Sequence, residues 1–356
     1  MPMSVVVCTV VAICGTFLHV GGSRPNGWQT FKYEYLNRRI NFGFESTNDG
    51  SLAMAYGGLN NHGYAGVHFP VLSHNGPGFR MEVVSTTNSS SSPMQMFSFG
   101  MAPIQLDEML ITGGSYDFAF LNSTWIFNLR KKTWRQVALG SSLPRMKYPV
   151  VAKINTTHLV MFGGQSTWST LKRPVSKYET RTWLYSHPDD SWTPLQIHVS
   201  PPPREKHSLV WTKRGVLLFG GNMNGEKVIY NDTWLFTNNT WHEIYPAHPL
   251  SPWPEGRYEM SMASNGTHAL MHGGAAKSGI MGDTWVFTVE SMSWARLTMP
   301  PSGDKSVMGS MIYLNSKFLR MGGMVRTQIA NQVRVWNGRT WELTNFGPRP
   351  DALKKH

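Results

Sequence analysis

Residues 215–241 carry the pattern that decides the fold class, and they read GVLLFGGNMNGEKVIYNDTWLFTNNTW. A short apolar run ends in the pair Gly220–Gly221. Such a run is typical of a buried strand whose end needs an unrestricted φ and a close approach of backbones. Trp234 lies in a second run of β-branched and aromatic residues, and Trp241 follows after a turn of Thr and Asn. The stretch therefore predicts three successive strands.

The same pattern recurs along the chain at intervals of 49 to 57 residues. Six glycine pairs each follow a short apolar run, and they are Gly57–Gly58, Gly113–Gly114, Gly163–Gly164, Gly220–Gly221, Gly273–Gly274 and Gly322–Gly323. The last five pairs are followed by two tryptophans each, namely Trp125 and Trp134, Trp183 and Trp192, Trp234 and Trp241, Trp285 and Trp294, and Trp336 and Trp341. A further apolar run precedes each pair and predicts a fourth strand. Four antiparallel strands cannot bury both faces of their sheet alone, so six such units are expected to stack into a ring.

The joint pattern of glycine pairs, Asp-Thr-Trp or Ser-Thr-Trp starts and paired tryptophans resembles the kelch-repeat β-propeller family, whose period is roughly 50 residues. The resemblance covers residues 40–345 and implies an all-β, six-bladed propeller with four antiparallel strands per blade. The first unit is degenerate, because no tryptophan follows Gly58 before residue 94. The sequence does not decide which strand closes the ring, since the segment NGWQTFKYEYL with Trp28 could supply an extra closing strand.

The first residues form a separate segment. Residues 5–20 contain no charged side chain, and the small residues Gly21, Gly22 and Ser23 follow. This layout predicts a secretory signal peptide over residues 1–23, with an uncleaved signal anchor or a buried strand as the alternatives. We expect an N-terminal segment at 24–39, the propeller at 40–346 and a C-terminal tail at 347–356. Cys8 and Cys14 both lie in the signal segment, so the mature chain would have no disulfide and no thiolate.

The composition limits the classes of function. Hydrophobic residues make up 41% of the chain, which excludes a disordered protein. The net charge of +12 favours acidic partners. We expect an extracellular protein or glycan partner, no nucleic acid and no membrane span after signal removal. We also expect the chain to be a monomer.

No motif for catalysis is present in the sequence. The histidines show no H-E-x-x-H motif, and Asp189–Asp190 lies in a turn, where Asp commonly stabilises the backbone. Copper radical oxidases of the kelch architecture need a Cys cross-linked to Tyr, and the mature chain would lack any Cys. We therefore predict no enzyme, no metal and no cofactor. A sugar-processing, mutarotase-like enzyme and an intracellular kelch scaffold with a false signal peptide stay as alternatives.

Six glycosylation sequons accompany the signal segment, at Asn88, Asn122, Asn155, Asn231, Asn238 and Asn265. In a propeller, the turns between strands one and two and between strands three and four lie on one face. Asn155, Asn238 and Asn265 fall in such turns and are expected to share that face. The other face, from which known kelch domains usually take ligands, is predicted to carry less sugar.

Aligning the blade connectors LPRMKY, PPREKH, WPEGRY and PSGDKS places four cations in one column, Lys147, Lys206, Arg257 and Lys305. The next column carries Tyr148, His207 and Tyr258, followed by a serine in the fourth connector. Cations converging on the channel mouth would attract an anionic ligand, whereas the alternative is a set of solvated residues at the start of strand one. The sequence thus predicts a secreted kelch-repeat module that binds an acidic protein or glycan through one face.

Overall fold

The computed structural model describes residues 39–60, 63–64, 68–75, 78–85, 92–138, 143–171, 173, 175–298, 305–325, 328–330 and 332–343. Over these residues the chain forms 37 strands and no helix. The predicted signal segment, most of the N-terminal segment with Trp28, the C-terminal tail and the sequon at Asn88 lie outside the described residues.

Six antiparallel sheets with four main strands each follow one another along the chain, and each is one blade; the sheet of the last blade also includes a fifth, short strand. Blade 1 contains β1 (Gly43–Ser46), β2 (Leu52–Tyr56), β5 (His68–Asn75) and β6 (Gly78–Ser85). Blade 2 contains β7 (Gly100–Ile104), β8 (Glu108–Thr112), β11 (Thr124–Asn128) and β12 (Thr133–Val137). Blade 3 contains β14 (Val150–Lys153), β15 (His158–Phe162), β18 (Trp183–Ser186) and β19 (Ser191–Pro194).

The second half of the ring repeats this order. Blade 4 contains β20 (Ser208–Thr212), β21 (Gly215–Phe219), β24 (Thr233–Thr237) and β25 (Thr240–Ile244). Blade 5 contains β27 (Ser261–Ser264), β28 (His268–His272), β31 (Thr284–Thr288) and β32 (Ser293–Leu297). Blade 6 contains β33 (Val307–Leu314), β34 (Lys317–Val325), β36 (Val333–Trp336) and β37 (Trp341–Leu343).

A short ribbon lies between the second and third strand of every blade. The ribbons are β3 (Leu59–Asn60) with β4 (Gly63–Tyr64), β9 (Ser115–Tyr116) with β10 (Ala119–Phe120), β16 (Gln165–Thr167) with β17 (Lys177–Tyr178), β22 (Asn222–Met223) with β23 (Val228–Ile229), β29 (Ala275–Ala276) with β30 (Gly279–Ile280), and the end of β34 with β35 (Gln328–Ile329). Two connector strands, β13 (Arg145–Lys147) and β26 (Arg257–Tyr258), pair with β16 and β29. We call the side of the ring formed by these ribbons and connectors the connector face, and the opposite side the turn face.

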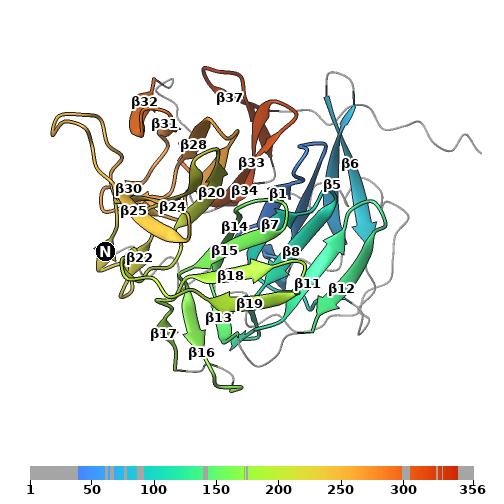
Figure 1. Cartoon of the computed structure of the whole chain (residues 1–356). Helices are drawn as coiled ribbons and strands as arrows, with labels where there is room; N and C mark the ends of the chain where they lie inside the picture. Colours follow the sequence, from blue (N-terminus) through green and yellow to red (C-terminus); the bar gives the residue numbers. More distant parts are fainter. Residues whose placement is uncertain are drawn as a thin grey trace, which may run out of the picture.

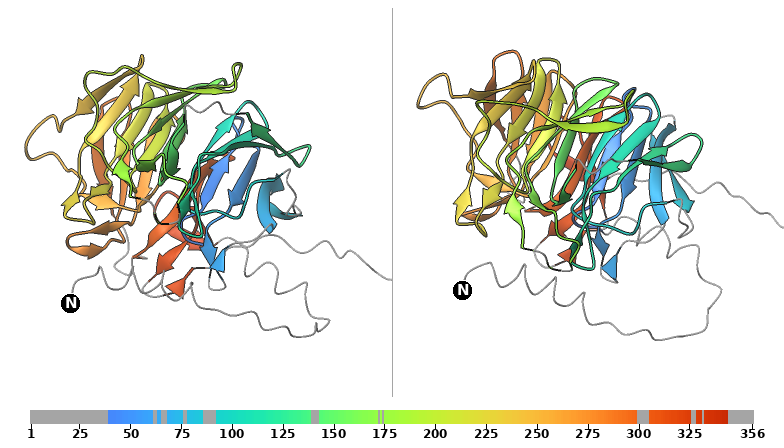
Figure 2. Two further views of the ribbon diagram at one scale, coloured as in Figure 1. Left: turned by 90° about the horizontal axis from the view of Figure 1, so that it is seen from below. Right: turned by 60° about the horizontal axis from the view of Figure 1, so that its bottom comes forward.

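The blades are arranged in chain order around a common centre (Figure 1) and stack side by side as seen in Figure 2. Their innermost strands contact one another in the cyclic order β1, β7, β14, β20, β27, β33 and back to β1. The predicted six-bladed β-propeller is therefore confirmed. Each described blade is built from one continuous stretch of chain, so no strand is shared between blade 6 and blade 1 within the described residues.

The seam between blade 6 and blade 1 is closed by packing and by backbone hydrogen bonds at both faces, and the one at the turn face runs from the amide of Asn315 to the carbonyl of Gly50 at 3.2 Å. Phe44 and Phe79 of blade 1 share a buried cluster with Ile312 and Met321 of blade 6. The amide of Gly323 donates a 2.8 Å hydrogen bond to the carbonyl of Arg39. Among the described residues, side-chain packing and these two backbone hydrogen bonds therefore hold blade 6 against blade 1.

The glycine pairs have the backbone conformation that the sequence predicts, since all twelve glycines have φ between +61° and +97°. The second glycine of each pair donates its amide to a connector carbonyl of the next blade, as Gly221 does to Arg257 at 2.8 Å. A Cβ at Gly220 would clash with the carbonyl oxygen of Arg257, in the connector of the next blade. Only glycine permits both this conformation and this approach, so the pairs set the spacing between blades.

The tryptophan pairs join each blade to its neighbour. The second tryptophan of blades 3 to 6 donates its indole N–H to a buried threonine of the preceding blade, at 3.1 Å for Trp192 and Thr124, 2.9 Å for Trp241 and Thr182, 3.0 Å for Trp294 and Thr233, and 3.2 Å for Trp341 and Thr284. Blade 1 has no equivalent threonine, and the buried Nε1 of Trp134 has no hydrogen-bond partner among the described residues. The degenerate first unit thus lacks one bond of the repeat.

Candidate functional site

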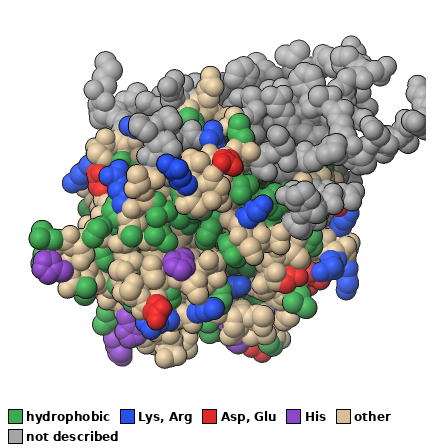
Figure 3. Space-filling view, turned by 90° about the horizontal axis from the view of Figure 1, so that it is seen from above, with side chains coloured by type: hydrophobic (Ala, Val, Ile, Leu, Met, Phe, Trp, Pro, Cys, Tyr) green, Lys and Arg blue, Asp and Glu red, His purple; other side chains and the backbone are tan. Residues whose placement is uncertain are grey.

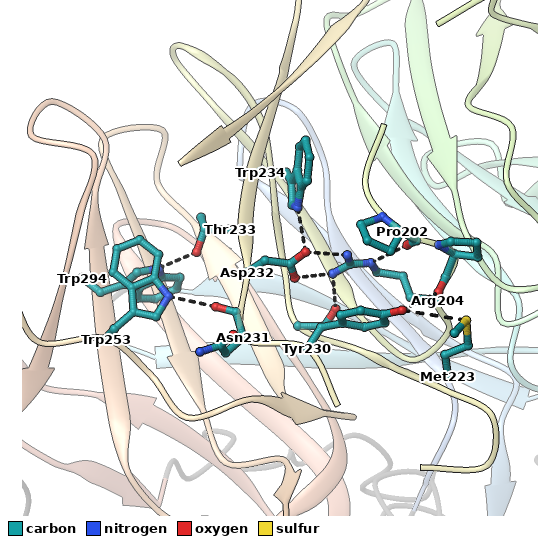
Figure 4. Close-up of polar contacts among 12 residues, drawn as sticks. Pro202, Arg204, Met223, Tyr230, Asn231, Asp232, Thr233, Trp234, Trp253 and Trp294 are labelled. Atoms are coloured by element: carbon teal, nitrogen blue, oxygen red, sulfur yellow. Dashed lines mark hydrogen bonds and ion pairs between the residues drawn. The ribbon is translucent and has the colours of Figure 1, made fainter. Parts of the chain in front are cut away.

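The Asp-Thr-Trp motif holds a buried arginine in blades 4 and 5. Arg204 is fully buried, and its two Nη atoms each donate a 2.6 Å hydrogen bond to the carboxylate of Asp232 (Figure 4). The same guanidinium donates to the carbonyl of Gly220, and Trp234 donates its indole N–H to Asp232 at 2.8 Å. A planar bidentate pair of this kind fixes both side chains. Arg204 therefore fastens a blade connector to its own blade.

Arg257 has the same role in blade 5. It is fully buried, donates to both carboxylate oxygens of Asp283 at 2.6 and 3.1 Å, and donates to the carbonyl of Gly273. The Arg257 guanidinium helps to hold the pKa of Asp283 below its usual value, against the opposing effect of burial. The prediction that Arg257 reaches a ligand is wrong, because its charge is already neutralised inside the fold.

Blade 3 departs from this motif. Arg181 stands where blades 4 and 5 have Asp, and the buried Nε1 of Trp183 has no hydrogen-bond partner among the described residues. The Arg181 guanidinium instead lies over the Trp183 ring at 4.7 Å and pairs with Glu179 at 2.7 Å. A cation over the ring face takes the place of the carboxylate.

The prediction that four cations occupy one equivalent position of the repeat is also wrong. The bond from the second glycine of each pair aligns the connectors at Arg39, Met96, Met146, Arg204, Arg257 and Ser306. Lys147, Lys206, Arg257 and Lys305 therefore stand at four different positions of the repeat. The structure does not bring them into one ring of cations.

The six residues that follow the glycine pairs line the end of the channel at the connector face, each paired with a connector residue. The pairs are Leu59 with Ile40, Ser115 with Phe97, Gln165 with Lys147, Asn222 with Glu205, Ala275 with Tyr258, and Met324 with Val307. Blades 5, 6 and 1, with Phe97 of blade 2, contribute a buried apolar cluster that includes Tyr258, whereas blades 3 and 4 contribute the polar pairs. This end of the channel is thus half apolar and half polar.

The next level is a narrow neck with one residue from each blade, all with positive φ: Asn41, Ser98, Tyr148, Lys206, Glu259 and Met308. Backbone bonds join most neighbours around this ring, as from Glu259 to Lys206 at 2.9 Å. The neck surrounds a cavity of about 140 Å³. Lys206 lies 3.1 Å from Glu259, and both side chains are at least nine-tenths buried. The neck thus contains an internal ion pair.

The charged side chains of the neck offset one another inside the fold, as Lys206 and Glu259 do. Burial alone would lower the pKa of Lys206, but Glu259, Tyr148 and Glu205 reverse that effect and raise it. Burial raises the pKa of Tyr148 to about 12 and also raises that of Glu205. Burial lowers the pKa of Lys147. The predicted ligand residue Lys206 is therefore a charged group that Glu259 already neutralises.

His207 lies beside the neck but packs into a blade interface. It is buried, its ring contacts Phe162 edge-on, and a Cβ at Gly163 would lie 2.6 Å from the ring. Burial lowers the pKa of His207 well below its ordinary value, with Arg204 adding to the effect. Its position matches that of Pro149 and Met260 in the adjacent blades, which indicates a packing role.

The opposite end of the channel opens at the turn face into a larger cavity of about 360 Å³, which we call the vestibule. Glu45 and Lys153 line it from blades 1 and 3. Burial raises the pKa of Glu45 to about 8, against the opposing charge of Lys153. Lys153 donates a 2.9 Å hydrogen bond to Asn48 and lies 4.6 Å from the ring centre of Trp211. The vestibule is a polar cavity that contains the Glu45 carboxyl group, whose pKa is raised.

Large apolar side chains are exposed mainly on the connector face. Of the eleven that the described residues expose, nine lie in its ribbons and connectors, and these are Met94, Phe118, Trp168, Leu171, Val175, Val199, Val228, Tyr245 and Leu250. Leu106 lies on the turn face and Leu343 in β37. Basic side chains are scattered among polar and apolar ones in the view of Figure 3 rather than gathered in one patch. Apolar exposure therefore distinguishes the connector face better than charge does.

The sequons divide between the faces as the strand order predicts. Asn155, Asn238 and Asn265 lie in turns of the turn face, whereas Asn122 and Asn231 lie near the connector face. The Oδ1 atoms of Asn155 and Asn265 each accept hydrogen bonds from the second and third residues after them. The amide nitrogen that a glycan would occupy takes no part in those contacts. Asn122 instead uses its amide nitrogen to contact the carbonyl of Leu143 at 3.5 Å.

Neither a metal centre nor a membrane-spanning helix is found in the part of the chain that the structure describes. No group of three or more His, Cys, Asp or Glu side chains there could hold a metal ion. No helix in that part is long and apolar enough to cross a membrane.

Comparisons with known proteins agree with the fold. Host cell factor of Drosophila melanogaster is 24% identical over 298 residues, an alignment that covers 77% of this chain and 19% of that protein. Adagio-like protein 1 of Oryza sativa subsp. japonica is 26% identical over 267 residues, covering 68% of this chain and 41% of that protein. The chain thus spans less than half the length of these curated relatives. The solved structure of YjhT matches with a TM-score of 0.64 at 12% identity and covers 86% of this chain and 98% of its own, which supports the fold alone.

The family itself follows from a match over most of the propeller. The sequence model of the KLHDC2/KLHL20/DRC7 Kelch-repeats domain matches residues 43–247 and 174–355. These two ranges together include all six blades, from β1 to β37. The chain belongs to the kelch-repeat family.

Proposed function

We propose that this kelch propeller is a secreted, non-catalytic binding module that recognises an extracellular protein through its connector face. The observation that carries the proposal is the placement of nine exposed large apolar side chains on that face. Exposed apolar surface of this extent marks interaction sites in otherwise well-packed proteins. The buried clamps of Arg204 and Arg257 hold the connectors in place, so the face is pre-organised for binding.

The distribution of sequons supports this choice of face. Asn155 and Asn238 are exposed, and with Asn265 they lie on the turn face. Glycans there would hinder partners on the turn face and leave the connector face accessible. The apolar segment at residues 5–20 supports export.

The partner is expected to be acidic because the chain has a net charge of +12, and not because four cations form a ring. Lys147 is half-buried, Lys305 is exposed at the connector face, and Lys206 and Arg257 are neutralised inside the fold. Positive charge spread over the surface increases the rate of association with an acidic partner without fixing its position.

A catalytic function is the second candidate, and the vestibule is the observation that favours it. Glu45 has a raised pKa of about 8 and faces the cavity with Lys153, an arrangement suited to proton transfer on a small ligand. Screening the chain for sugar and lactone turnover, with Glu45→Gln as the inactive control, separates this function from binding alone.

The test of the proposed function is an array of cell-surface proteins and glycans probed with the purified chain. Tyr245→Ser with Leu250→Ser changes the connector face, and Leu106→Ser changes the turn face. We expect protein ligands whose signal falls with the connector-face variant and not with Leu106→Ser. Glycan ligands only, or a loss confined to Leu106→Ser, would contradict the proposal.

A further inference from the structure

One ribbon of the connector face differs from the others in length. The turn of the blade 3 ribbon, between β16 and β17, contains nine residues, 168–176. The corresponding turns contain two residues in blades 2 and 5 and four in blade 4. In repeat proteins, an insertion confined to one repeat maps to a loop and often to the binding face. We call residues 168–176 the blade 3 loop.

The blade 3 loop exposes three large apolar side chains. Trp168, Leu171 and Val175 are 63%, 71% and 91% exposed. Phe118, at the turn of the adjacent blade 2 ribbon, is also exposed. Tryptophan and arginine are enriched in interaction hot spots, and this loop contains Trp168 and Arg173. Most of the apolar surface of Trp168, Leu171 and Val175 is exposed to solvent and is therefore available to a partner.

The loop is attached to both neighbouring blades. The amide of Arg173 contacts the carbonyl of Phe118 at 3.4 Å, and its guanidinium lies 4.5 Å from the centre of the Phe118 ring. On the other side, Tyr178 accepts a 2.8 Å hydrogen bond from the amide of Asn224. Ser176 donates to Gln165 at 2.8 Å. These contacts restrict the loop before binding and reduce the entropy lost when a partner docks.

Within the blade 3 ribbon, from β16 to β17, the charged residues have one sign. Residues 165–178 read QSTWSTLKRPVSKY and contain Lys172, Arg173 and Lys177 with no acidic residue. Arg173 and Lys177 are exposed, and neither has an ion pair among the described residues. A partner segment would therefore gain from carboxylates next to its apolar side chains.

We propose that the blade 3 loop is the recognition element of the connector face and binds an extended peptide segment that combines acidic and apolar side chains. Trp168, Leu171 and Val175 receive the apolar side chains, and Arg173 and Lys177 pair with the carboxylates. This inference rests on the proposed function and adds to it the position and the chemistry of the partner.

The experiment selects displayed random twelve-residue peptides on the purified full chain and measures their affinities by fluorescence anisotropy. We expect the selected peptides to be rich in Asp or Glu together with Leu, Ile or Phe. Trp168→Ser with Leu171→Ser should weaken binding at least tenfold. Arg173→Glu with Lys177→Glu should weaken it several-fold and reduce its dependence on salt.

Matched controls come from the turn face. Leu106→Ser removes an equally exposed apolar side chain, and Lys213→Glu with Arg214→Glu reverses two exposed cations in the turn of blade 4. Both controls should leave the affinities unchanged. All variants change exposed side chains, and their thermal unfolding should match that of the parent chain.

Other outcomes overturn the inference separately from the proposed function. Peptides that keep their affinity for both loop variants but lose it in Tyr245→Ser with Leu250→Ser would place the site elsewhere on the connector face. The inference then fails and the proposed function stands. Selected peptides without acidic residues, or no selected peptides at all, would also overturn the inference. Binding that is lost only in the turn-face controls would overturn both.

Discussion

The indole Nε1 of Trp294, in blade 5, lies 3.0 Å from Oγ1 of Thr233, in blade 4. Both side chains are buried, so this hydrogen bond has no access to solvent. Replacing Thr233 with Val keeps the shape and leaves the indole donor without a partner, which should cost about 1–3 kcal/mol of unfolding free energy.

Urea unfolding measures this cost. Thr193→Val is the control, because Thr193 is exposed on the outer strand β19, and its effect should stay within about 0.5 kcal/mol. Equal effects of the two substitutions would show that the bond between the blades contributes nothing to stability.

The clamp in blade 5 makes a second prediction. Asp283→Ala removes the carboxylate that pairs with the fully buried Arg257 and accepts the Trp285 indole N–H. An unpaired buried guanidinium should cost about 3–5 kcal/mol. The midpoint of urea unfolding measures it, and Glu290→Ala, at an exposed position, should leave that midpoint almost unchanged. A cost below about 1 kcal/mol would mean that water reaches Arg257.

The third prediction separates backbone strain from steric contact. Gly221 and Gly225 both have positive φ, but an added Cβ meets the carbonyl of Glu205 at 2.8 Å only at Gly221, and nothing lies within 4 Å at Gly225. Gly225→Ala should cost about 1–2 kcal/mol through strain alone. Gly221→Ala should cost about 2–4 kcal/mol, because the neighbouring connector must also move. Thermal and urea unfolding compare the two, and equal costs would contradict the close approach of Gly221 to the connector of blade 4.

The raised pKa of Glu45 predicts how stability depends on pH. Below its ordinary pKa of 4.5, Glu45 is protonated in the folded and the unfolded chain alike. Between 4.5 and about 8 the unfolded chain releases this proton while the folded chain keeps it, so the contribution of Glu45 to stability is lost as pH rises. Glu45→Gln should therefore stabilise the chain more at pH 8 than at pH 5, by on the order of 1–2 kcal/mol because the vestibule is partly solvated. Urea unfolding of both chains at the two pH values measures it, and a difference independent of pH would contradict the raised pKa.

Export and glycosylation give the fifth prediction. A secretory host should release a chain that begins near Ser23 or Arg24 and carries N-glycans on Asn155, Asn238 and Asn265. Asn155→Asp keeps the Oδ1 atom that accepts the turn's hydrogen bonds and removes the glycan acceptor. It should remove one glycosidase-sensitive step in mass without changing the melting temperature. An intact Met1 and no glycosidase-sensitive mass would exclude secretion.

The sequence predicted the blades because each element of the repeat has a local signature. Glycine pairs, Asp-Thr-Trp starts and second tryptophans each report a contact that recurs around the ring, as Gly221 and Trp294 do. The division of turns between the two faces also followed, since it depends only on the order of antiparallel strands. These features need no knowledge of the distances between blades.

The register of the connectors could not be predicted in the same way. It is set by the hydrogen bond from the second glycine of a pair to a carbonyl of the next connector, and a carbonyl has no signature in the side-chain sequence. Aligning by charge placed Lys206 beside Arg257, although Arg204 is the residue equivalent to Arg257.

The blade 3 loop did have a signal in the sequence. The interval from Gly164 to Trp183 is 19 residues, against 11 to 13 in the other four units with tryptophans. Comparing these intervals would have identified the insertion without a structure. The exposure of Trp168 could not have been found this way, because the other tryptophans that the structure describes are buried or partly buried.

The way the ring closes has a mechanical consequence. The described blades share no strand across the seam between blade 6 and blade 1, where Gly323 and Arg39, and Asn315 and Gly50, make backbone hydrogen bonds. Within the described residues, these two blades can therefore separate without any strand being pulled out of a sheet. Tension applied across β1 and β33 would open this joint by breaking side-chain packing and a few hydrogen bonds, while every blade keeps its own four strands. Under load the chain should lengthen first as a row of intact blades and lose individual sheets only afterwards.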